Sequence, residues 1–228
     1  MKPWFVFVLM LAAVSAGVRA QEVTSTEAAR PLPPPACCGP ITPGGLQLLK
    51  LLNDMDVEHH WVSGLKVDWK NGNPLGAGDL RGHTHCSAFA AAVGERIGVY
   101  MLRPPDHKQS FLASAQGRWF ASSDGRREGW QQIKTFEEAQ RHANEGDLVV
   151  LDYINPIASK PGHIAIVRPS LKSEAQLREE GPETTQAGAH NFEDGTAKYS
   201  FVKHEGAWPT KVLAFWHATK FSSDPVTH

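Results

Sequence analysis

A cysteine and a histidine stand in sequence contexts that suit a nucleophile and its base. Cys86 lies in the segment THCSAF (84–89), at the start of a predicted helix, and His163 lies in GHIAIV (162–167), at the start of a predicted strand. A thiol attacks a carbonyl at neutral pH when its pKa is lowered, which a helix N-terminus assists, and when a base takes its proton. The two segments therefore predict a Cys86 nucleophile with His163 as general base.

The elements that would hold this pair follow from periodicity. From Cys86 to about residue 102, apolar residues recur mostly in steps of three or four, which predicts a helix that Thr84 caps. The segment His163–Val167 predicts a buried strand. Further helices are predicted at 46–56, 108–116 and 136–145, and further strands at 146–153, 183–187 and 212–216. A long helix followed by an antiparallel sheet is an α+β layout.

The N-terminal part of the sequence indicates export. A basic start, an apolar run over 4–14 and the small-residue exit at Ala20 predict a Sec signal peptide (1–20) cleaved after Ala20. We expect a secreted or periplasmic protein with no integral membrane span after cleavage, because no later stretch is long and apolar enough. Residues 21–43 contain six prolines and predict a flexible, unpacked arm, which leaves 44–228 as the folded domain.

The charge balance and the cysteine count indicate which partners are excluded and which thiol is left free. The chain has 23 Lys and Arg against 24 Asp and Glu, a net charge of −1, and no basic stripe, so nucleic acid is not an expected partner. Of its three cysteines, Cys37 and Cys38 are adjacent in the arm. If these two pair with each other or with another chain, Cys86 is left as a free thiol. The sequence does not indicate an oligomeric state.

In order and spacing, these segments resemble the NlpC/P60 and CHAP group of papain-like cysteine peptidases and amidases. The resemblance covers about 84–191: Cys86 opening a helix, the GDLV segment at 146–149, and GHIAIV at 162–167. It implies a nucleophile helix packed on a small antiparallel sheet, with the base His163 at the start of a strand. It also implies amide or peptide bonds of cell-wall peptidoglycan as the substrate. A charged insertion (172–183) and the residues just before Cys86 depart from the family pattern.

The resemblance also implies a third polar residue on the next strand, which orients the histidine. Gln186 is favoured, because its side-chain carbonyl could accept the imidazole N–H and fix the tautomer. Asn191, at the end of that strand, is the alternative.

Binding residues are predicted around the pair. Trp61 and Trp69 lie in a Gly-rich segment and could stack on sugar rings, although tryptophans also pack in cores. His85, beside the nucleophile, could shape the cleft. A zinc site at His83, His85 and Cys86 is not favoured, because ligands so close in sequence converge poorly and no His-Glu-x-x-His motif is present. No metal or cofactor is expected.

The predicted function is hydrolysis of amide bonds by a Cys86 thiolate, with His163 as general base and peptidoglycan peptides as the first substrate. A thiol enzyme with other amide substrates, such as a transamidase, is related chemistry. The alternative from another class is a secreted module that binds cell wall or a partner, keeps the fold and lacks catalysis. In that alternative Cys86 is a small buried apolar residue.

Overall fold

A six-stranded antiparallel sheet carries His163 near its middle. In the computed structural model, which describes residues 35–76 and 83–222, the strand order is β1-β6-β2-β3-β4-β5. Every neighbouring pair of strands is antiparallel. The strands are β1 (Gln131–Ile133), β2 (Leu148–Tyr153), β3 (His163–Val167), β4 (Glu183–Gln186), β5 (Phe192–Thr196) and β6 (Leu213–His217).

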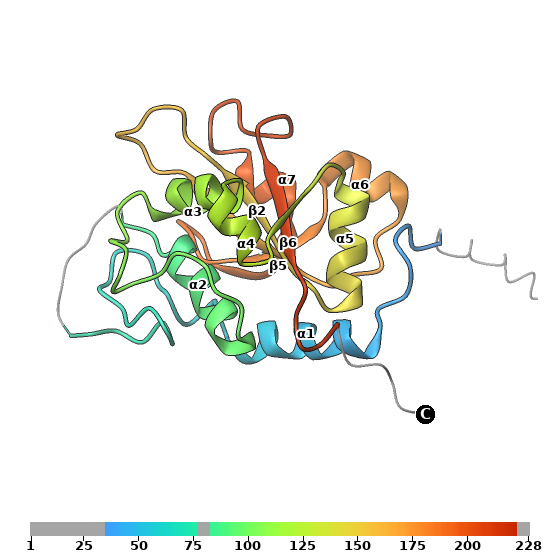
Figure 1. Cartoon of the computed structure of the whole chain (residues 1–228), viewed down its shortest axis with the longest axis horizontal. Helices are drawn as coiled ribbons and strands as arrows, with labels where there is room; N and C mark the ends of the chain where they lie inside the picture. The colour runs from blue at the N-terminus through green and yellow to red at the C-terminus, as the bar shows by residue number, and fades with distance from the viewer. Residues whose placement is uncertain (1–34, 77–82, 223–228) are drawn as a thin grey trace, which may run out of the picture. The chain divides into compact units, whose positions relative to one another are not determined.

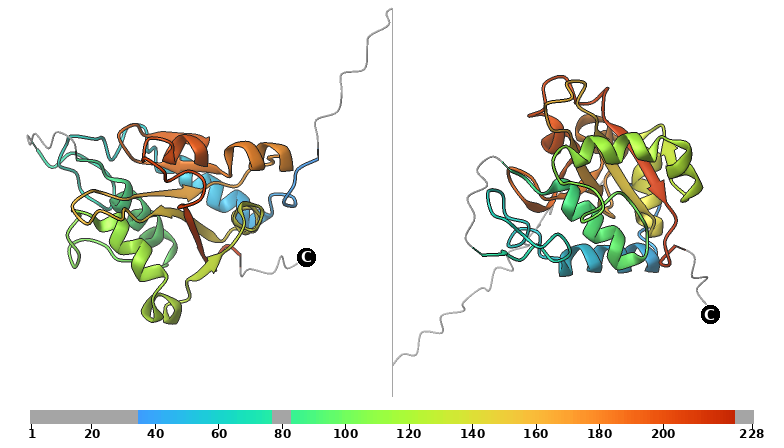
Figure 2. Two further views of the ribbon diagram at one scale, coloured as in Figure 1. Left: turned by 90° about the horizontal axis from the view of Figure 1, so that it is seen from above. Right: turned by 60° about the vertical axis from the view of Figure 1, so that its left-hand side comes forward.

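Helices cover both faces of this sheet (Figures 1 and 2). They are α1 (Pro43–Asp54), α2 (Cys86–Ile97), α3 (Leu112–Phe120), α4 (Ser123–Arg127), α5 (Phe136–Glu145), α6 (Glu174–Glu180) and α7 (Ala197–Phe201). Helices α2 and α3 pack on one face of the central strands, and α5 and α7 pack on the other. All six residues of β2 are buried, because alternate side chains enter two different apolar clusters.

The mixed composition of helices and antiparallel strands agrees with the α+β prediction. The helix at 136–145 and the strand at 163–167 have the predicted bounds. Helix α2 ends at Ile97, earlier than expected, because Gly98 adopts a left-handed conformation (φ 79°) and closes the helix. The charged insertion contains α6, which Ser173 and Gln176 start with a reciprocal capping box.

The predicted cap of the nucleophile helix is wrong. His85, not Thr84, occupies the N-cap position of α2, and its side chain makes no capping hydrogen bond. The first N–H groups of α2 therefore have no side-chain acceptor from the N-cap residue. The Thr84 side chain interacts with the Cys86 thiol instead.

The part of the N-terminal arm that the structure describes is packed on the domain, contrary to the prediction of an unpacked arm as far as residue 43. Cys37 N–H donates to Lys172 O (2.9 Å), and Thr42 donates to Asn144 O through both its N–H (2.9 Å) and its hydroxyl (3.0 Å). Cys37 and Cys38 form a disulfide, and Cys86 is free. The predicted signal peptide (1–20) and residues 21–34 lie outside the described residues.

Asn144 links three segments through its buried amide. Its Nδ2 donates to Gly39 O (3.2 Å) and Ser170 O (3.0 Å), and its Oδ1 accepts from Ser170 N (2.9 Å) and Gln140 Nε2 (3.0 Å). The amide thus joins the arm, α5 and the segment after β3. Within the described residues, no helix is long and apolar enough to cross a bilayer.

Replacing this amide tests its contribution to the fold. We expect Asn144→Ala to lower the free energy of unfolding by about 2–3 kcal/mol, because it leaves several buried backbone groups without partners. Urea unfolding measures the change, with Asn53→Ala on the exposed side of α1 as the control. Equal losses in the two variants would contradict this role.

Candidate active site

Cys86 is the first residue of α2, and its side chain is almost fully buried. Hydrogen bonds from the backbone of Ile164 and Ser87 and from the Thr84 side chain lower the pKa of the thiol, but burial raises it by more. The net pKa is therefore above its ordinary value, contrary to the expectation from the helix N-terminus. At rest, Cys86 is a protonated thiol.

His163, at the start of β3, is oriented by Gln186, the last residue of β4. The His163 Nε2 and Gln186 Oε1 atoms lie 2.6 Å apart. Gln186 Nε2 donates to His190 O (3.1 Å), which fixes the amide so that its carbonyl faces the imidazole. Nε2 of His163 is therefore the protonated nitrogen, and Nδ1 is left as a proton acceptor. This is the arrangement predicted for Gln186.

Burial also keeps the histidine neutral. Desolvation lowers the pKa of His163 to about 4, although the hydrogen bond to Gln186 opposes the shift. The ring stacks on His204 (centroids 5.2 Å apart, planes at 19°) and meets Phe201 edge-on at 5.1 Å. The pKa of His204 is likewise lowered to about 4, by burial and by the nearby His163. His204 was not predicted, because no local motif marks it.

The thiol and the imidazole face adjoining hollows. The hollow beside Cys86 has a volume of about 440 Å³ and that beside His163 about 190 Å³, and Thr84, Pro161 and Gly162 line both. No hydrogen bond joins Cys86 to His163 in the described parts of the chain. Ile164 packs in the cluster under α2, whereas the preceding His163 contacts Phe201 of α7, since successive strand residues face opposite ways. The pair is therefore two separate neutral groups at rest.

Gly162 allows the chain to reach this position. A Cβ on Gly162 would lie 2.3 Å from Tyr153 O and 2.4 Å from Ser114 Oγ. Only glycine fits where β3 begins between β2 and α3, which accounts for the Gly-His pair in the sequence.

Asn191, the alternative third residue, is not brought to His163. Its Nδ2 donates to Val57 O and His60 O (2.7 Å each), and its Oδ1 accepts from Gly188 N (2.9 Å). Asn191 thus holds the loop after β4 against the segment after α1. Its partners are backbone groups, so its role here is structural.

Of the three predicted substrate-binding residues, Trp61 is buried in the core, whereas Trp69 and His85 line a hollow. Trp61 has no exposed surface, contacts Phe89 edge-on and donates from Nε1 to Trp69 O (3.0 Å), so its prediction as a binding residue is wrong. Trp69 and His85 do line a hollow of about 480 Å³, together with Gln109, which also lines the Cys86 hollow. His85 is 2% exposed, and burial lowers its pKa.

Asp152 is a buried acid near Cys86. It lies on β2 opposite Ile164, has no exposed surface, and neither carboxyl oxygen has a hydrogen-bond partner among the described residues. Burial raises its pKa well above the ordinary value, and the nearby Cys86 adds to the shift. No sequence motif marks Asp152 as a site residue.

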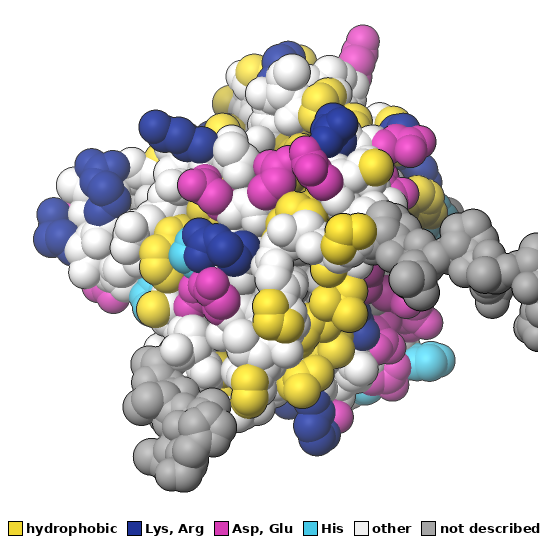
Figure 3. Space-filling view, turned by 90° about the vertical axis from the view of Figure 1, so that its right-hand side faces the viewer, with side chains coloured by type: hydrophobic (Ala, Val, Ile, Leu, Met, Phe, Trp, Pro, Cys, Tyr) yellow, Lys and Arg dark blue, Asp and Glu magenta, His cyan; other side chains and the backbone are white. Residues whose placement is uncertain are grey.

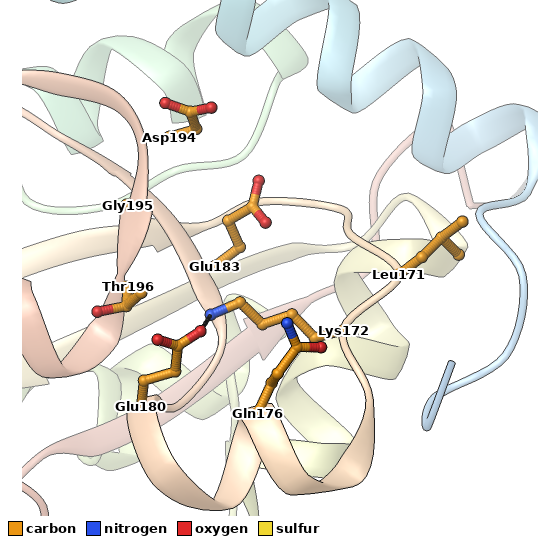
Figure 4. A pocket seen from close by; sticks show the side chains of 8 residues that line it. All are labelled: Leu171, Lys172, Gln176, Glu180, Glu183, Asp194, Gly195 and Thr196. Atoms are coloured by element: carbon orange, nitrogen blue, oxygen red, sulfur yellow. Dashed lines mark hydrogen bonds and ion pairs between the residues drawn. The ribbon is translucent and has the colours of Figure 1, made fainter. Parts of the chain in front are cut away.

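Other polar clusters lie apart from these residues. A hollow of about 450 Å³ between α6 and β5 holds the Lys172–Glu180 pair (2.8 Å) with Glu183 and Asp194 nearby (Figure 4). In the described residues, the group of side chains close enough to share a metal ion is His142, Glu145 and Asp147. On the face shown in Figure 3, Lys and Arg side chains are interspersed with Asp and Glu side chains.

No protein-family model matches the chain, and a search of curated proteins finds no sequence match. The arrangement at Cys86, His163 and Gln186 therefore has to be judged by its own geometry. A buried thiol, a neutral imidazole with Nδ1 available, and an amide that fixes its tautomer can together perform acyl transfer.

Changing the partner of His163 should change its titration. In Gln186→Glu a carboxylate replaces the amide carbonyl, and its attraction for imidazolium should raise the pKa of His163 from about 4 by about one to three units. In Gln186→Leu the pKa should stay at or below the wild-type value, because the bond that opposes desolvation is lost. NMR titration of the ring measures both, and equal pKa values in the three proteins would contradict the assigned contact.

The buried neutral imidazole should make stability depend on pH. The pKa of His163 is about 4 in the fold and about 6.5 in the unfolded chain, so the unfolded chain binds more protons between these values. Its contribution to the free energy of unfolding, on the order of 3 kcal/mol, is present above pH 6.5 and lost towards pH 4. Denaturant unfolding at several pH values should show a shallower slope for His163→Gln than for the wild type. Parallel slopes would exclude this linkage.

Proposed function

We propose that this protein is a papain-like thiol hydrolase of amide bonds, with Cys86 as nucleophile, His163 as general base and Gln186 as the residue that orients the base. The observation that carries the proposal is the 2.6 Å contact between His163 and Gln186. It leaves Nδ1 of a neutral imidazole available beside the hollow that adjoins Cys86.

The proposed reaction is acyl transfer through a thioester. As the Cys86 sulfur bonds to the substrate carbonyl carbon, its proton passes to Nδ1 of His163, and the oxyanion is held by backbone N–H groups at the start of α2. The imidazolium then protonates the leaving amine as the C–N bond breaks. Water, deprotonated by His163, hydrolyses the thioester and restores the thiol.

The neutral resting pair defines the type of catalysis. Because burial disfavours both the thiolate and the imidazolium, the proton moves when the substrate is attacked and not before. This is general-base catalysis, and it needs His163 unprotonated, which holds at any pH well above 4.

Cell-wall peptide is the proposed substrate class. Two observations support it: the order of the Cys86, GDLV and Gly-His segments, and the predicted signal peptide, which would deliver the protein to the compartment of the cell wall. The hollow that contains Trp69 could accommodate a part of the substrate remote from the scissile bond, since Gln109 connects it to the Cys86 hollow.

One observation favours a second candidate function, a binding module without catalysis. Cys86 is 5% exposed and makes no hydrogen bond to His163 in the described part of the chain. A protein that only binds would use the hollows and leave the thiol inert. The two functions differ in what happens when Cys86 is replaced.

Activity of the variants tests the proposal. We expect Cys86→Ala to abolish release of amines from peptidoglycan peptides, and His163→Ala to reduce it by about 10²–10⁴-fold. His59→Ala, which changes an exposed histidine, is the matched control and should be unaffected. Full activity in Cys86→Ala would overturn the mechanism. If the wild type cleaves nothing and Cys86→Ala binds peptide as tightly as the wild type, the binding module is favoured.

A further inference from the structure

The β2 residue Asp152 has an environment that the proposed mechanism does not use. Its side chain is on the face of the sheet that α2 and α3 cover, since it pairs with Ile164, whose side chain packs in the cluster under α2. The backbone of Ile164 also hydrogen-bonds the Cys86 thiol. One strand residue thus contacts the nucleophile and faces the acid, which puts Asp152 directly behind the active thiol.

Helix α3 closes the other side of the carboxyl. A Cβ on Gly117 would lie 2.3 Å from Asp152 Oδ1, so the carboxyl occupies the space that a side chain at this helix position would fill. The adjacent Gln116 is also fully buried. Its Nε2 donates to Ser87 O (3.1 Å) and Leu102 O (2.8 Å), whereas its Oε1 has no partner among the described residues.

The region behind Cys86 therefore has too few hydrogen-bond donors. Both oxygens of Asp152 and Oε1 of Gln116 are buried acceptors without partners in the part of the chain described. If Asp152 were ionised, its carboxylate could only accept hydrogen bonds, and its charge would be costly to bury. A protonated carboxyl supplies one O–H donor and removes the charge.

Among the residues that the structure describes, the groups facing Asp152 include one cation. Helix α2 contributes the Cys86 thiol, and α3 contributes Arg118, whose exposed guanidinium slightly favours the carboxylate. The neighbouring strands β3 and β6 pair Ile164 and Leu213 with Asp152, and neither carries a charge. Thiolate and carboxylate would thus share one buried space with little positive charge to offset them.

We propose that Asp152 is a positioning residue for the nucleophile, a carboxylic acid that keeps its proton at neutral pH and that, once ionised, holds Cys86 in the thiol form. The space behind Cys86 tolerates one negative charge. While Asp152 is protonated, the proton of the attacking thiol can pass to His163 and the charge can develop on sulfur. At alkaline pH, Asp152 releases its proton to solvent, and the carboxylate then opposes the thiolate.

The effect of Asp152 on catalysis rests on the proposed function. The charge coupling itself is a property of the resting protein and needs no substrate. Because Cys37 and Cys38 are bonded to each other, iodoacetamide labels Cys86 alone in the native chain, which makes the coupling measurable.

The first test is the pH dependence of Cys86 alkylation in the wild type and in Asp152→Asn, a neutral variant of nearly the same shape. We expect the midpoint of the Cys86 titration to fall by about one unit or more in Asp152→Asn, because the wild-type thiol titrates against an ionised Asp152. At pH values where Asp152 is protonated, the two proteins should be alkylated at equal rates. Asp124→Asn, on the exposed surface of α4, is the control and should match the wild type. Equal midpoints in wild type and Asp152→Asn would overturn the coupling.

The second test observes the proton directly. Infrared difference spectra of wild type minus Asp152→Asn at pH 7 should show the carbonyl band of a protonated acid, and a carboxylate band there would overturn the proposal. If Asp152→Asn does not fold, Arg118→Gln takes its place. Loss of the surface cation should move the ionisation of Asp152 in the infrared titration to higher pH. An unchanged midpoint would count against the proposal. Both readouts are independent of amide hydrolysis, so a protein without hydrolytic activity could still confirm the coupling.

Discussion

Close packing of the backbone at the start of β3 is the constraint on which the candidate site depends. Gly162 lies against Tyr153 O and Ser114, where no Cβ would fit. The next residue, His163, meets Gln186 on β4, and the one after it, Ile164, contacts the Cys86 thiol and faces Asp152. Three consecutive residues thus connect the proposed base, the proposed nucleophile and a buried acid, because the strand sits between α2 and α7.

Exclusion of water determines the charge state of this region. Desolvation is the largest effect on the pKa of Cys86, of Asp152 and of His163, and in each case it favours the neutral form. Hydrogen bonds from Ile164, Thr84 and Gln186 oppose it only in part. Cys86, His163 and Asp152 form no ion pair with one another at rest, so in the proposed reaction charge has to develop where a substrate and the backbone N–H groups of α2 can stabilise it.

Each of the two hollows presents one of the two groups that a thiol hydrolase would need. One presents the thiol and the other presents the imidazole, and the segment around Pro161 and Gly162 borders both. The ring of His204 stacks on the imidazole and lines the same hollow, and burial and the nearby His163 lower the pKa of His204. The disulfide between Cys37 and Cys38 lies in the segment that Lys172 and Asn144 hold against the domain, and Cys86 remains the free thiol.

Local patterns in the sequence determined the elements and the candidate pair. The period of three to four residues after Cys86 and the apolar run after His163 are properties of short segments, so α2 and β3 could be predicted. Gln186 as the partner of His163 came from the family resemblance, with Asn191 as the alternative. Tertiary packing decided the rest. Trp61 proved to be core, Asn191 proved to hold a loop, and Asp152 and His204 came to the site, because these outcomes depend on which distant residues exclude water from each side chain. A helix N-terminus gives a thiol a low pKa only where solvent or hydrogen-bond partners offset the cost of burial. At Cys86, burial by the packing of α2 on β3 raises the pKa by more than the hydrogen bonds lower it.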